Sequence, residues 1–213
     1  MPSPLATVYI VDDDASFLAA VSRFLRAAGF DVKTFPSATK FLGDLTPDAH
    51  GCVIADLKMP GLSGLDLQNA LSKGDSPMPV IFLTGHGDIP TSVRAMRHGA
   101  EDFLTKRAPK EELLDAVKRA LARDAQARDE RARLRELRAR FDVLTPRERE
   151  VLAHVLQGKL NKQTAFDLAI TERTVKAHRG SITAKLGLQS VVELVRFAEE
   201  LGISPASSGS RNS

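Results

Sequence analysis

The 213-residue sequence contains a single cysteine, Cys52, so no intramolecular disulfide can form. Cys52 stands in an apolar run, where we interpret it as a small buried side chain in a reducing compartment. No hydrophobic run approaches the length of a membrane-spanning helix, and residues 1–4 begin no basic-then-apolar secretory pattern. These absences predict a cytoplasmic protein with no membrane partner.

The sequence lacks a large net charge: 30 basic side chains nearly balance 27 acidic ones, for a formal net charge of +3, but the charges are unevenly distributed along the chain. Residues 1–117 carry 11 basic and 15 acidic side chains, residues 118–140 carry nine and four, and residues 141–213 carry ten and eight. An acidic front half with a basic remainder indicates that only the back half meets a polyanion. The length suits one large domain or two smaller ones.

Polar side chains follow four short apolar runs in the front half of the chain. The acidic cluster 12–14 follows the run Thr7–Val11, Asp56 follows 53–55, Thr84 follows 80–83, and Lys106 follows Asp102–Thr105. With a further strand at residues 31–35 and helical patterns between the runs, this order predicts a doubly wound, five-stranded parallel sheet. In the flavodoxin-like strand order 2-1-3-4-5, the switch point brings Asp12, Asp13 and Asp56 together.

This set of side chains favours a site for a divalent cation and a phosphoryl group. Carboxylates are the hard oxygen ligands that Mg²⁺ prefers. A cation would keep Asp56 ionised as a nucleophile and would offset charge on a transferring phosphoryl group. Lys106 would add a point charge beside it.

The residues Asp12-Asp13, Asp56-x-x-Met59-Pro60-x-x-x-Gly64, Thr84 and Lys106 resemble the receiver domain of two-component response regulators, over roughly residues 5–120. The resemblance implies that Asp56 accepts a phosphoryl group from the phosphohistidine of a sensor histidine kinase. It implies that Mg²⁺ (or Mn²⁺) is held by Asp13, Asp56 and the backbone carbonyl of Lys58, with Asp12 helping through water.

The resemblance also implies a switch. Thr84 and Lys106 would bind phosphoryl oxygens, and Thr84 would move together with the ring of Phe103. The receiver family usually has proline directly after the lysine, in a cis peptide, but this chain has Arg107. A cis bond without proline costs roughly 2.5–4 kcal/mol. We therefore expect a trans bond, with slower phosphorylation or an altered population of the active state.

The connector 118–140 contains neither proline nor glycine and consists mainly of helix-forming residues. It predicts that the last receiver helix runs on from near Pro109 for about thirty residues, or about 45 Å. Two apolar seams in different phases permit pairing over short sections only, and a solvated charged linker is the alternative. The seams are Leu114-Val117-Leu121-Ala125 and Leu134-Leu137-Phe141-Leu144.

The back domain, residues 141–203, is predicted to be a small all-α domain of four helices, followed by a disordered tail at 204–213. Thr145-Pro146-Arg147-Glu148 forms a capping box that opens its first helix. In the second helix Ala165, Leu168 and Ala169 are expected to face inward.

The third helix is predicted at residues 172–186. At 100° per residue, its inward face carries Val175, His178, Ile182 and Leu186. Its outward face carries Arg173, Lys176, Ala177, Gly180 and Ala184. Basic and small side chains on this face would let the helix enter a major groove of DNA without steric obstruction.

The motifs Leu144-Thr145-x-x-Glu148, Asn161-Lys162 and Thr174-Val175-Lys176-x-His178 resemble the LuxR/NarL-type helix-turn-helix domain. The resemblance implies double-stranded DNA as a partner, with Lys176 and Ala177 at base edges. Phosphate contacts are implied for Arg173, Thr174, Arg179 and Lys185.

Together the two domains, 1–117 and 141–203, resemble FixJ-type response regulators. This implies a transcription regulator that dimerises on phosphorylation and works with RNA polymerase, and that is no enzyme beyond slow self-dephosphorylation. Two alternatives stay open. One is a constitutive DNA binder whose receiver is only a dimerisation module. The other is a phosphatase of the haloacid-dehalogenase type with Asp12 as nucleophile, suggested by Asp12-x-Asp14-x-Ser16.

Overall fold

The computed structural model describes residues 6–74, 77–85 and 89–203, with the side chains of 89–91 not described. The tail predicted at 204–213 lies outside these residues. The chain divides into two compact units, Met1–Asp129 and Glu130–Ser213. No helix in the described parts of the chain is both long enough and apolar enough to cross a membrane.

The first unit is built on a five-stranded parallel sheet in the order β2-β1-β3-β4-β5, which confirms the predicted fold. Strands β1, β3 and β4 are buried along their whole length, as expected for strands covered on both faces. The strands are β1 (Thr7–Val11), β2 (Asp31–Phe35), β3 (Gly51–Ala55), β4 (Val80–Thr84) and β5 (Asp102–Thr105).

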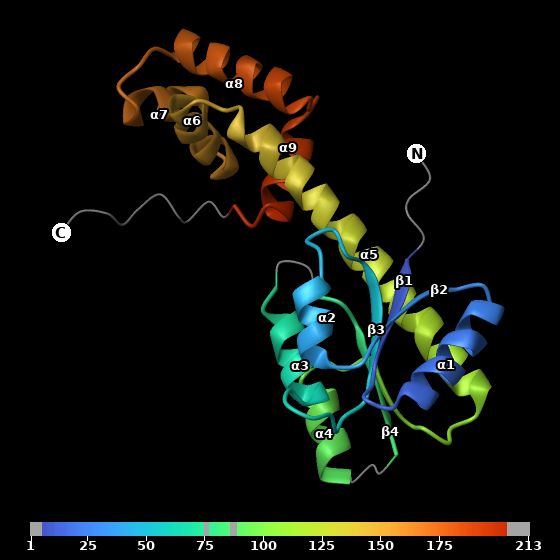
Figure 1. Ribbon diagram of the computed structural model, residues 1–213. Coiled ribbons are helices and arrows are strands. Elements are labelled where there is room, and N and C mark those ends of the chain that lie inside the picture. The colour runs from blue at the N-terminus through green and yellow to red at the C-terminus, as the bar shows by residue number, and fades with distance from the viewer. Residues whose placement is uncertain (1–5, 75–76, 86–88, 204–213) are drawn as a thin grey trace. The chain divides into compact units, whose positions relative to one another are not determined.

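Helices cover both faces of this sheet (Figure 1). Helices α1 and α5 lie on one face, over a core that includes Ile10, Leu25 and Val117. Helices α2, α3 and α4 lie on the other, over a core that includes Phe41 and Phe82. Each such buried side chain contributes about 1.5–3 kcal/mol relative to exposure. The helices are α1 (Ala15–Ala27), α2 (Ala38–Asp44), α3 (Gly64–Ser72), α4 (Ile89–Arg97) and α5 (Lys110–Asp142).

Local signals fix where these elements begin. The Asp14 side chain accepts hydrogen bonds from the N–H groups of Ser16 and Phe17, at 2.8 and 3.1 Å, and so caps α1. Gly51 opens β3 with φ +128, and a Cβ there would lie 1.8 Å from the Thr7 carbonyl oxygen. Only glycine fits this register between β1 and β3.

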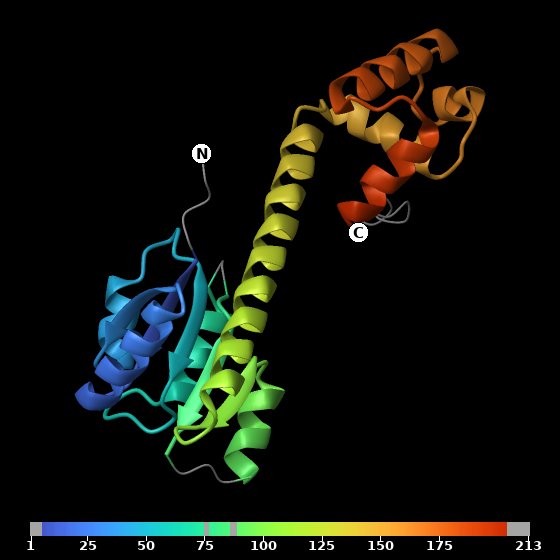
Figure 2. The same ribbon diagram turned by 90° about the vertical axis from the view of Figure 1, so that its right-hand side faces the viewer.

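Helix α5 is continuous over 33 residues, in line with its lack of proline and glycine (Figure 2). Several residues of its expected pairing seams pack inside the two units, whereas Ala125 and Leu134 are exposed. Val117 is fully buried in the first unit, and Leu137 and Leu144 pack in the core of the second. The stretch of α5 up to Asp129 belongs to the first unit, beyond the boundary at residue 117 expected from the sequence.

The second unit packs helices α6 to α9 and the end of α5 around one core, as the predicted four-helix domain requires. Val151, Val175 and Leu186 are fully buried there. Helix α7 is shorter than predicted, and Ala169 is exposed rather than inward-facing. The helices are α6 (Pro146–Leu156), α7 (Asn161–Asp167), α8 (Glu172–Leu186) and α9 (Val191–Glu200).

The early end of α7 has a local cause. Ala169 has φ +52, and its N–H donates to Phe166 O at 3.2 Å while Ile170 N–H donates to Ala165 O at 3.0 Å. A left-handed residue with such backward hydrogen bonds closes a helix. The chain thereby turns out of α7 before Ala169 can reach the core.

Candidate functional site

Three carboxylates converge at the carboxyl ends of β1 and β3. Asp12 and Asp13 follow β1 and Asp56 follows β3, where Asp56 N–H donates to Val11 O at 2.9 Å. One carboxylate oxygen from each of the three lies within 4.8 Å of the other two. Asp12 and Asp56 are buried, whereas Asp13 is exposed. Hard oxygen donors that meet at a site open on one side fit a divalent cation that keeps part of its water shell.

Lys106 completes the site from the end of β5. Its Nζ lies 2.6 Å from Asp12 Oδ2 and 2.8 Å from Asp56 Oδ2. Its backbone N–H donates to Thr84 O at 2.8 Å, which ties the end of β5 to the end of β4. No cis peptide occurs in the described chain, so the bond to Arg107 is trans as expected. The ammonium group reaches Asp56 with Arg107 in the following position.

The electrostatics of the site follow from burial and from this ion pairing. Desolvation raises the pKa of Asp12, although the contacts with Lys106 and the Asp14 N–H lower it in part. Burial disfavours the charge of Lys106, but its bonds to Asp12 and Asp56 outweigh burial, so that the pKa of Lys106 is raised. Lys106 is therefore a permanent cation at neutral pH.

Thr84 and Phe103 lie on the two neighbouring strands, β4 and β5. Thr84 is 2% exposed and is the last residue of β4. Phe103 is half-buried, with its ring centroid 6.3 Å from that of Phe82. Lys58 follows Asp56 in the loop after β3, and its N–H lies 3.4 Å from Asp56 Oδ1. All the residues expected at the phosphorylation site thus lie at one end of the sheet or on its last two strands.

Gly64 lets α3 start directly against this site. A Cβ at Gly64 would lie 2.3 Å from the Asp56 carbonyl oxygen and 2.9 Å from the Phe82 ring. The glycine in the receiver-like motif therefore has a packing reason, a close approach of helix α3 to the backbone of Asp56.

In the second unit, α8 presents the surface expected from its helical projection. Val175, Ile182 and Leu186 are buried and His178 is half-buried. The opposite face is exposed, and neither of its basic residues forms an ion pair within the described part of the chain. This exposed face consists of Arg173, Lys176, Ala177, Gly180 and Ala184.

The other residues expected to contact DNA have partners within the unit. Arg179 Nη1 donates to Asn161 Oδ1 at 2.9 Å, which links α8 to the start of α7. The Thr174 hydroxyl lies 2.9 Å from the capping hydroxyl of Thr171. Lys185 Nζ lies 2.8 Å from Glu148 Oε2. Each of these side chains would have to reach a phosphate alongside its present partner.

The sequence patterns placed Glu148 in a capping box and in the LuxR-like motif, but they did not show its contacts with α8. The carboxylate accepts from Thr145 N–H at 2.8 Å, from Ser181 Oγ at 2.6 Å and from Lys185 Nζ at 2.8 Å. These bonds, with Lys185 first, lower the pKa of Glu148 to about 2. The available signal was the spacing of Glu148 three and four residues before the apolar Val151 and Leu152, but its partners 33 and 37 residues away depend on how α8 packs.

Comparison with known proteins agrees with this geometry. Residues 8–118 match the response regulator receiver domain, and residues 142–198 match the bacterial regulatory proteins of the luxR family. The chain is 47% identical over 196 residues to response regulator protein TmoT of Ectopseudomonas mendocina, covering 92% of this chain and 89% of TmoT. It is 40% identical over 207 residues to transcriptional regulatory protein FixJ of Azorhizobium caulinodans, covering 97% of both.

Solved structures give the same result. Response regulator StyR is similar with a TM-score of 0.82 and 43% identity, over 92% of this chain and 100% of StyR. Full-length FixJ from B. japonicum is similar with a TM-score of 0.56 and 35% identity, over 94% of this chain and 99% of FixJ. The chain belongs to the FixJ-type response regulators, DNA-binding regulators of two-component systems in which a receiver domain precedes a LuxR-type helix-turn-helix domain.

Proposed function

We propose that Asp56 is the phosphoacceptor of this regulator. The observation that supports this most is the convergence of Asp12, Asp13 and Asp56 beside Lys106. An Asp56 carboxylate oxygen would attack the phosphorus of the kinase's phosphohistidine. The new P–O bond forms as the P–N bond breaks, and the imidazole leaves with the bonding electron pair. The Lys106 ammonium and the Thr84 hydroxyl would bind the phosphoryl oxygens, since both groups are donors at the same strand ends.

Asp13 and Asp56, with the backbone carbonyl of Lys58, would hold Mg²⁺ or Mn²⁺, and Asp12 would act through water. When bound, the cation offsets the negative charge of the phosphoryl group and of the carboxylates. Exposed Asp13 supports this assignment, because it leaves the cluster accessible from solvent.

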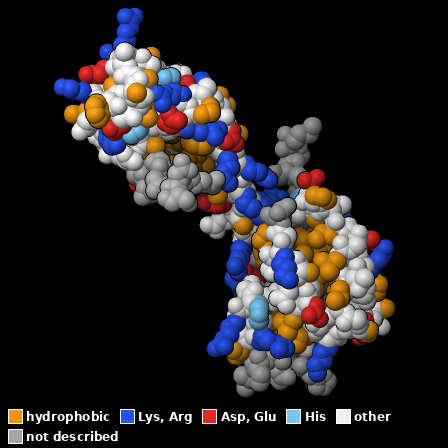
Figure 3. All heavy atoms as spheres, turned by 90° about the vertical axis from the view of Figure 1, so that its left-hand side faces the viewer, with side chains coloured by type: hydrophobic (Ala, Val, Ile, Leu, Met, Phe, Trp, Pro, Cys, Tyr) orange, Lys and Arg blue, Asp and Glu red, His pale blue; other side chains and the backbone are white. Residues whose placement is uncertain are grey.

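Phosphorylation would draw the Thr84 hydroxyl toward Asp56 and let the half-buried ring of Phe103 turn behind it. This conformational change would alter the face formed by α4, β5 and α5, and the altered face would favour a homodimer. Val93 and Met96, three residues apart on α4, are 45% and 47% exposed and offer apolar surface on that face. Figure 3 views the receiver from the side of α2, α3 and α4 and shows hydrophobic side chains gathered among basic ones.

In the dimer, two copies of α8 would enter the major groove at half-sites about one helical turn apart. Lys176 and Ala177 would meet base edges, and Arg173, Thr174, Arg179 and Lys185 would meet phosphates. Dimerisation would double the modest basic surface of a single domain. This would strengthen DNA binding, because phosphate contacts dominate its affinity. RNA polymerase would then be recruited or excluded at the promoter.

The two alternative functions, a phosphatase and a constitutive DNA binder, would require different roles for the residues of this site. A phosphatase with Asp12 as nucleophile needs Asp14 as its acid–base partner, but the Asp14 carboxylate caps α1. A constitutive DNA binder needs no phosphoryl chemistry, but Lys106 reaches Asp56 despite Arg107. Both observations favour the phosphoacceptor.

The decisive experiment measures the mass of the full chain in solution with and without acetyl phosphate and Mg²⁺, for wild type and Asp56→Asn. A phosphoryl adduct and a dimer that both require Asp56 are expected. A dimer under all conditions would place the signal elsewhere than in assembly. Absence of any adduct would favour the constitutive DNA binder, and an adduct lost in Asp12→Asn but kept in Asp56→Asn would favour the phosphatase.

A further inference from the structure

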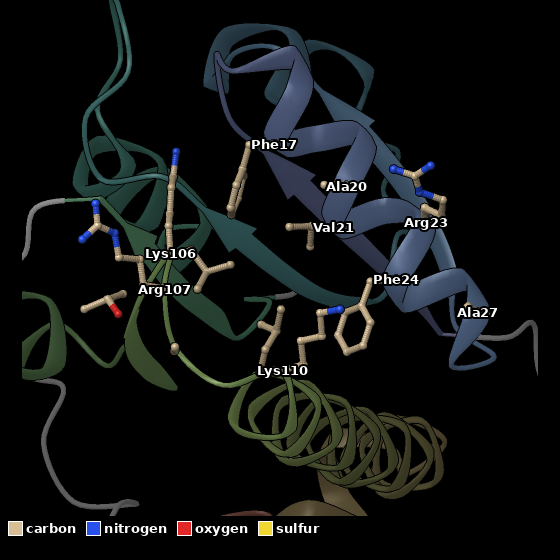
Figure 4. A pocket seen from close by; sticks show the side chains of 13 residues that line it. Phe17, Ala20, Val21, Arg23, Phe24, Ala27, Lys106, Arg107 and Lys110 are labelled. Carbon is tan, nitrogen blue, oxygen red and sulfur yellow. The ribbon is translucent and has the colours of Figure 1, made fainter.

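A groove of about 620 Å³ lies between α1 and the segment that joins β5 to α5 (Figure 4). Helix α1 lines it with Phe17, Val21 and Phe24, and the other wall carries Lys106, Arg107 and Lys110. Of these only Lys106 belongs to the phosphoacceptor site. The groove is thus a separate concave surface that shares one residue with that site.

The charge of the groove is one-sided. Its lining includes several cations and no acidic side chain. Arg107 and Lys110 are exposed, and neither forms an ion pair among residues 6–74, 77–85 and 89–203. The charges of Arg107 and Lys110 are therefore balanced by solvent ions, whereas that of Lys106 is paired with Asp12 and Asp56. An anion that binds beside Arg107 and Lys110, away from the carboxylates at Lys106, would meet no acidic side chain among the residues that line the groove.

The cations also lie against aromatic rings. Lys106 Nζ lies 4.4 Å from the centroid of the Phe17 ring, and Lys110 Nζ lies 5.4 Å from that of Phe24. Between these two pairs, Val21 and Ala20 of α1 continue an apolar wall (Figure 4). The groove therefore has an apolar surface with cationic groups at its edges. Such a surface is complementary to an anion that has an apolar part.

We propose that this groove binds a small amphipathic organic anion, a carboxylate on a two-ring aromatic or medium-length acyl body. The volume lies within the roughly 300–1,000 Å³ of small-molecule sites. The apolar body would pack on Phe17, Val21 and Phe24, and the carboxylate would pair with Arg107 or Lys110. Arginine suits this role because its planar guanidinium binds a carboxylate through two parallel hydrogen bonds.

The test uses 2-naphthoate as probe, with the full-length protein and calorimetric titration. Its neutral analogue 2-naphthamide has the same rings, so the comparison isolates the charge. We expect saturable binding of naphthoate and an affinity about tenfold lower for the amide, the equivalent of one charge-assisted contact. NMR shift changes are expected in α1 and in residues 105–110. Equal binding of both probes, no binding, or shifts confined to other surfaces would overturn the proposal.

Variants separate the groove from unspecific attraction. Arg107→Gln and Lys110→Gln should each weaken naphthoate binding, and Ala20→Phe should block it by filling the groove from the exposed face of α1. Lys33→Gln removes an exposed cation of β2 and should leave binding unchanged. If all four variants bind alike, the proposal fails. Asp56→Asn should still bind naphthoate, so failure of the phosphoacceptor proposal and failure of this one are distinguishable.

Discussion

Lys185 Nζ on α8 lies 2.8 Å from Glu148 Oε2 on α6, and the same carboxylate caps the N-terminus of α6 through Thr145. Glu148 is only 4% exposed, and Ser181 Oγ donates to its other oxygen at 2.6 Å. One buried carboxylate thus fixes both the start of α6 and the orientation of α8. Since α8 carries the exposed basic surface, Glu148 positions the surface proposed to read DNA.

Glu148→Gln is therefore expected to destabilise the second unit by about 1–3 kcal/mol at pH 7, because charge-assisted bonds to a buried group are lost. The folded-state pKa of Glu148, about 2, lies below its ordinary value of 4.5. Its contribution is thus fully present above pH 4.5 and is lost as the pH falls through about 2. The difference between wild type and variant should shrink accordingly.

Urea unfolding followed through the NMR signals of α8 at several pH values measures this difference. Glu150→Gln is the matched control, since Glu150 is an exposed residue of the same helix whose ion pair among the described residues is with Arg147, three positions earlier. It should change the stability little. A Glu148→Gln effect that is independent of pH would contradict the proposed role of its charge.

Lys176 and Lys185 should differ in DNA binding. Lys176 is exposed without an ion pair among the described residues, whereas Lys185 is held by Glu148. Lys176→Met should weaken binding to a specific site by about 1–3 kcal/mol and relax its sequence preference. Lys185→Met should act more uniformly across sequences, through a lost phosphate contact and a less well fixed α8. Binding isotherms on specific and unrelated duplexes over a range of salt concentrations distinguish the two, and identical profiles would count against the division into base and phosphate contacts.

Gly64→Ala should disturb the phosphoacceptor loop. The added Cβ would meet the Asp56 carbonyl oxygen at 2.3 Å, so α3 or the loop must shift. We expect a loss of about 1–3 kcal/mol in receiver stability, typical of overpacking, and slower labelling by acetyl phosphate. Gly43→Ala in α2 is the control, because its Cβ would meet nothing within 4 Å and alanine favours a helix. Equal stability and labelling of the two variants would refute the close approach.

Asp124 should stabilise the receiver although it lies beyond its expected boundary. Its Oδ2 accepts a hydrogen bond from Gly51 N–H at 3.0 Å, and the side chain is 2% exposed. Asp124→Ala would leave that buried N–H unsatisfied, at a cost of about 1–3 kcal/mol. Thermal unfolding of the receiver measures the loss. Asp115→Ala, at an exposed position of the same helix, should be nearly neutral, and a neutral Asp124→Ala would mean that α5 does not anchor the start of β3.

The sequence by itself determined the local architecture. Short apolar runs ending in Asp12, Asp56, Thr84 and Lys106 predicted the strands, and the strand order was that of the flavodoxin-like fold, whose parallel connections are right-handed. Periodicity likewise predicted which face of α8 is exposed. These features depend on residues that are near one another in the chain, or on rules that hold for all parallel sheets.

Only the tertiary structure decided the long-range contacts. The ion pair of Lys106 with Asp12 and Asp56, the bonds of Glu148 to α8, and the anchoring of β3 by Asp124 each join residues more than 30 positions apart. The burial of Val117 in the receiver core was also decided there. The physical reason is that local propensity states what a segment prefers, whereas burial and ion pairing depend on which surfaces the folded chain brings into contact.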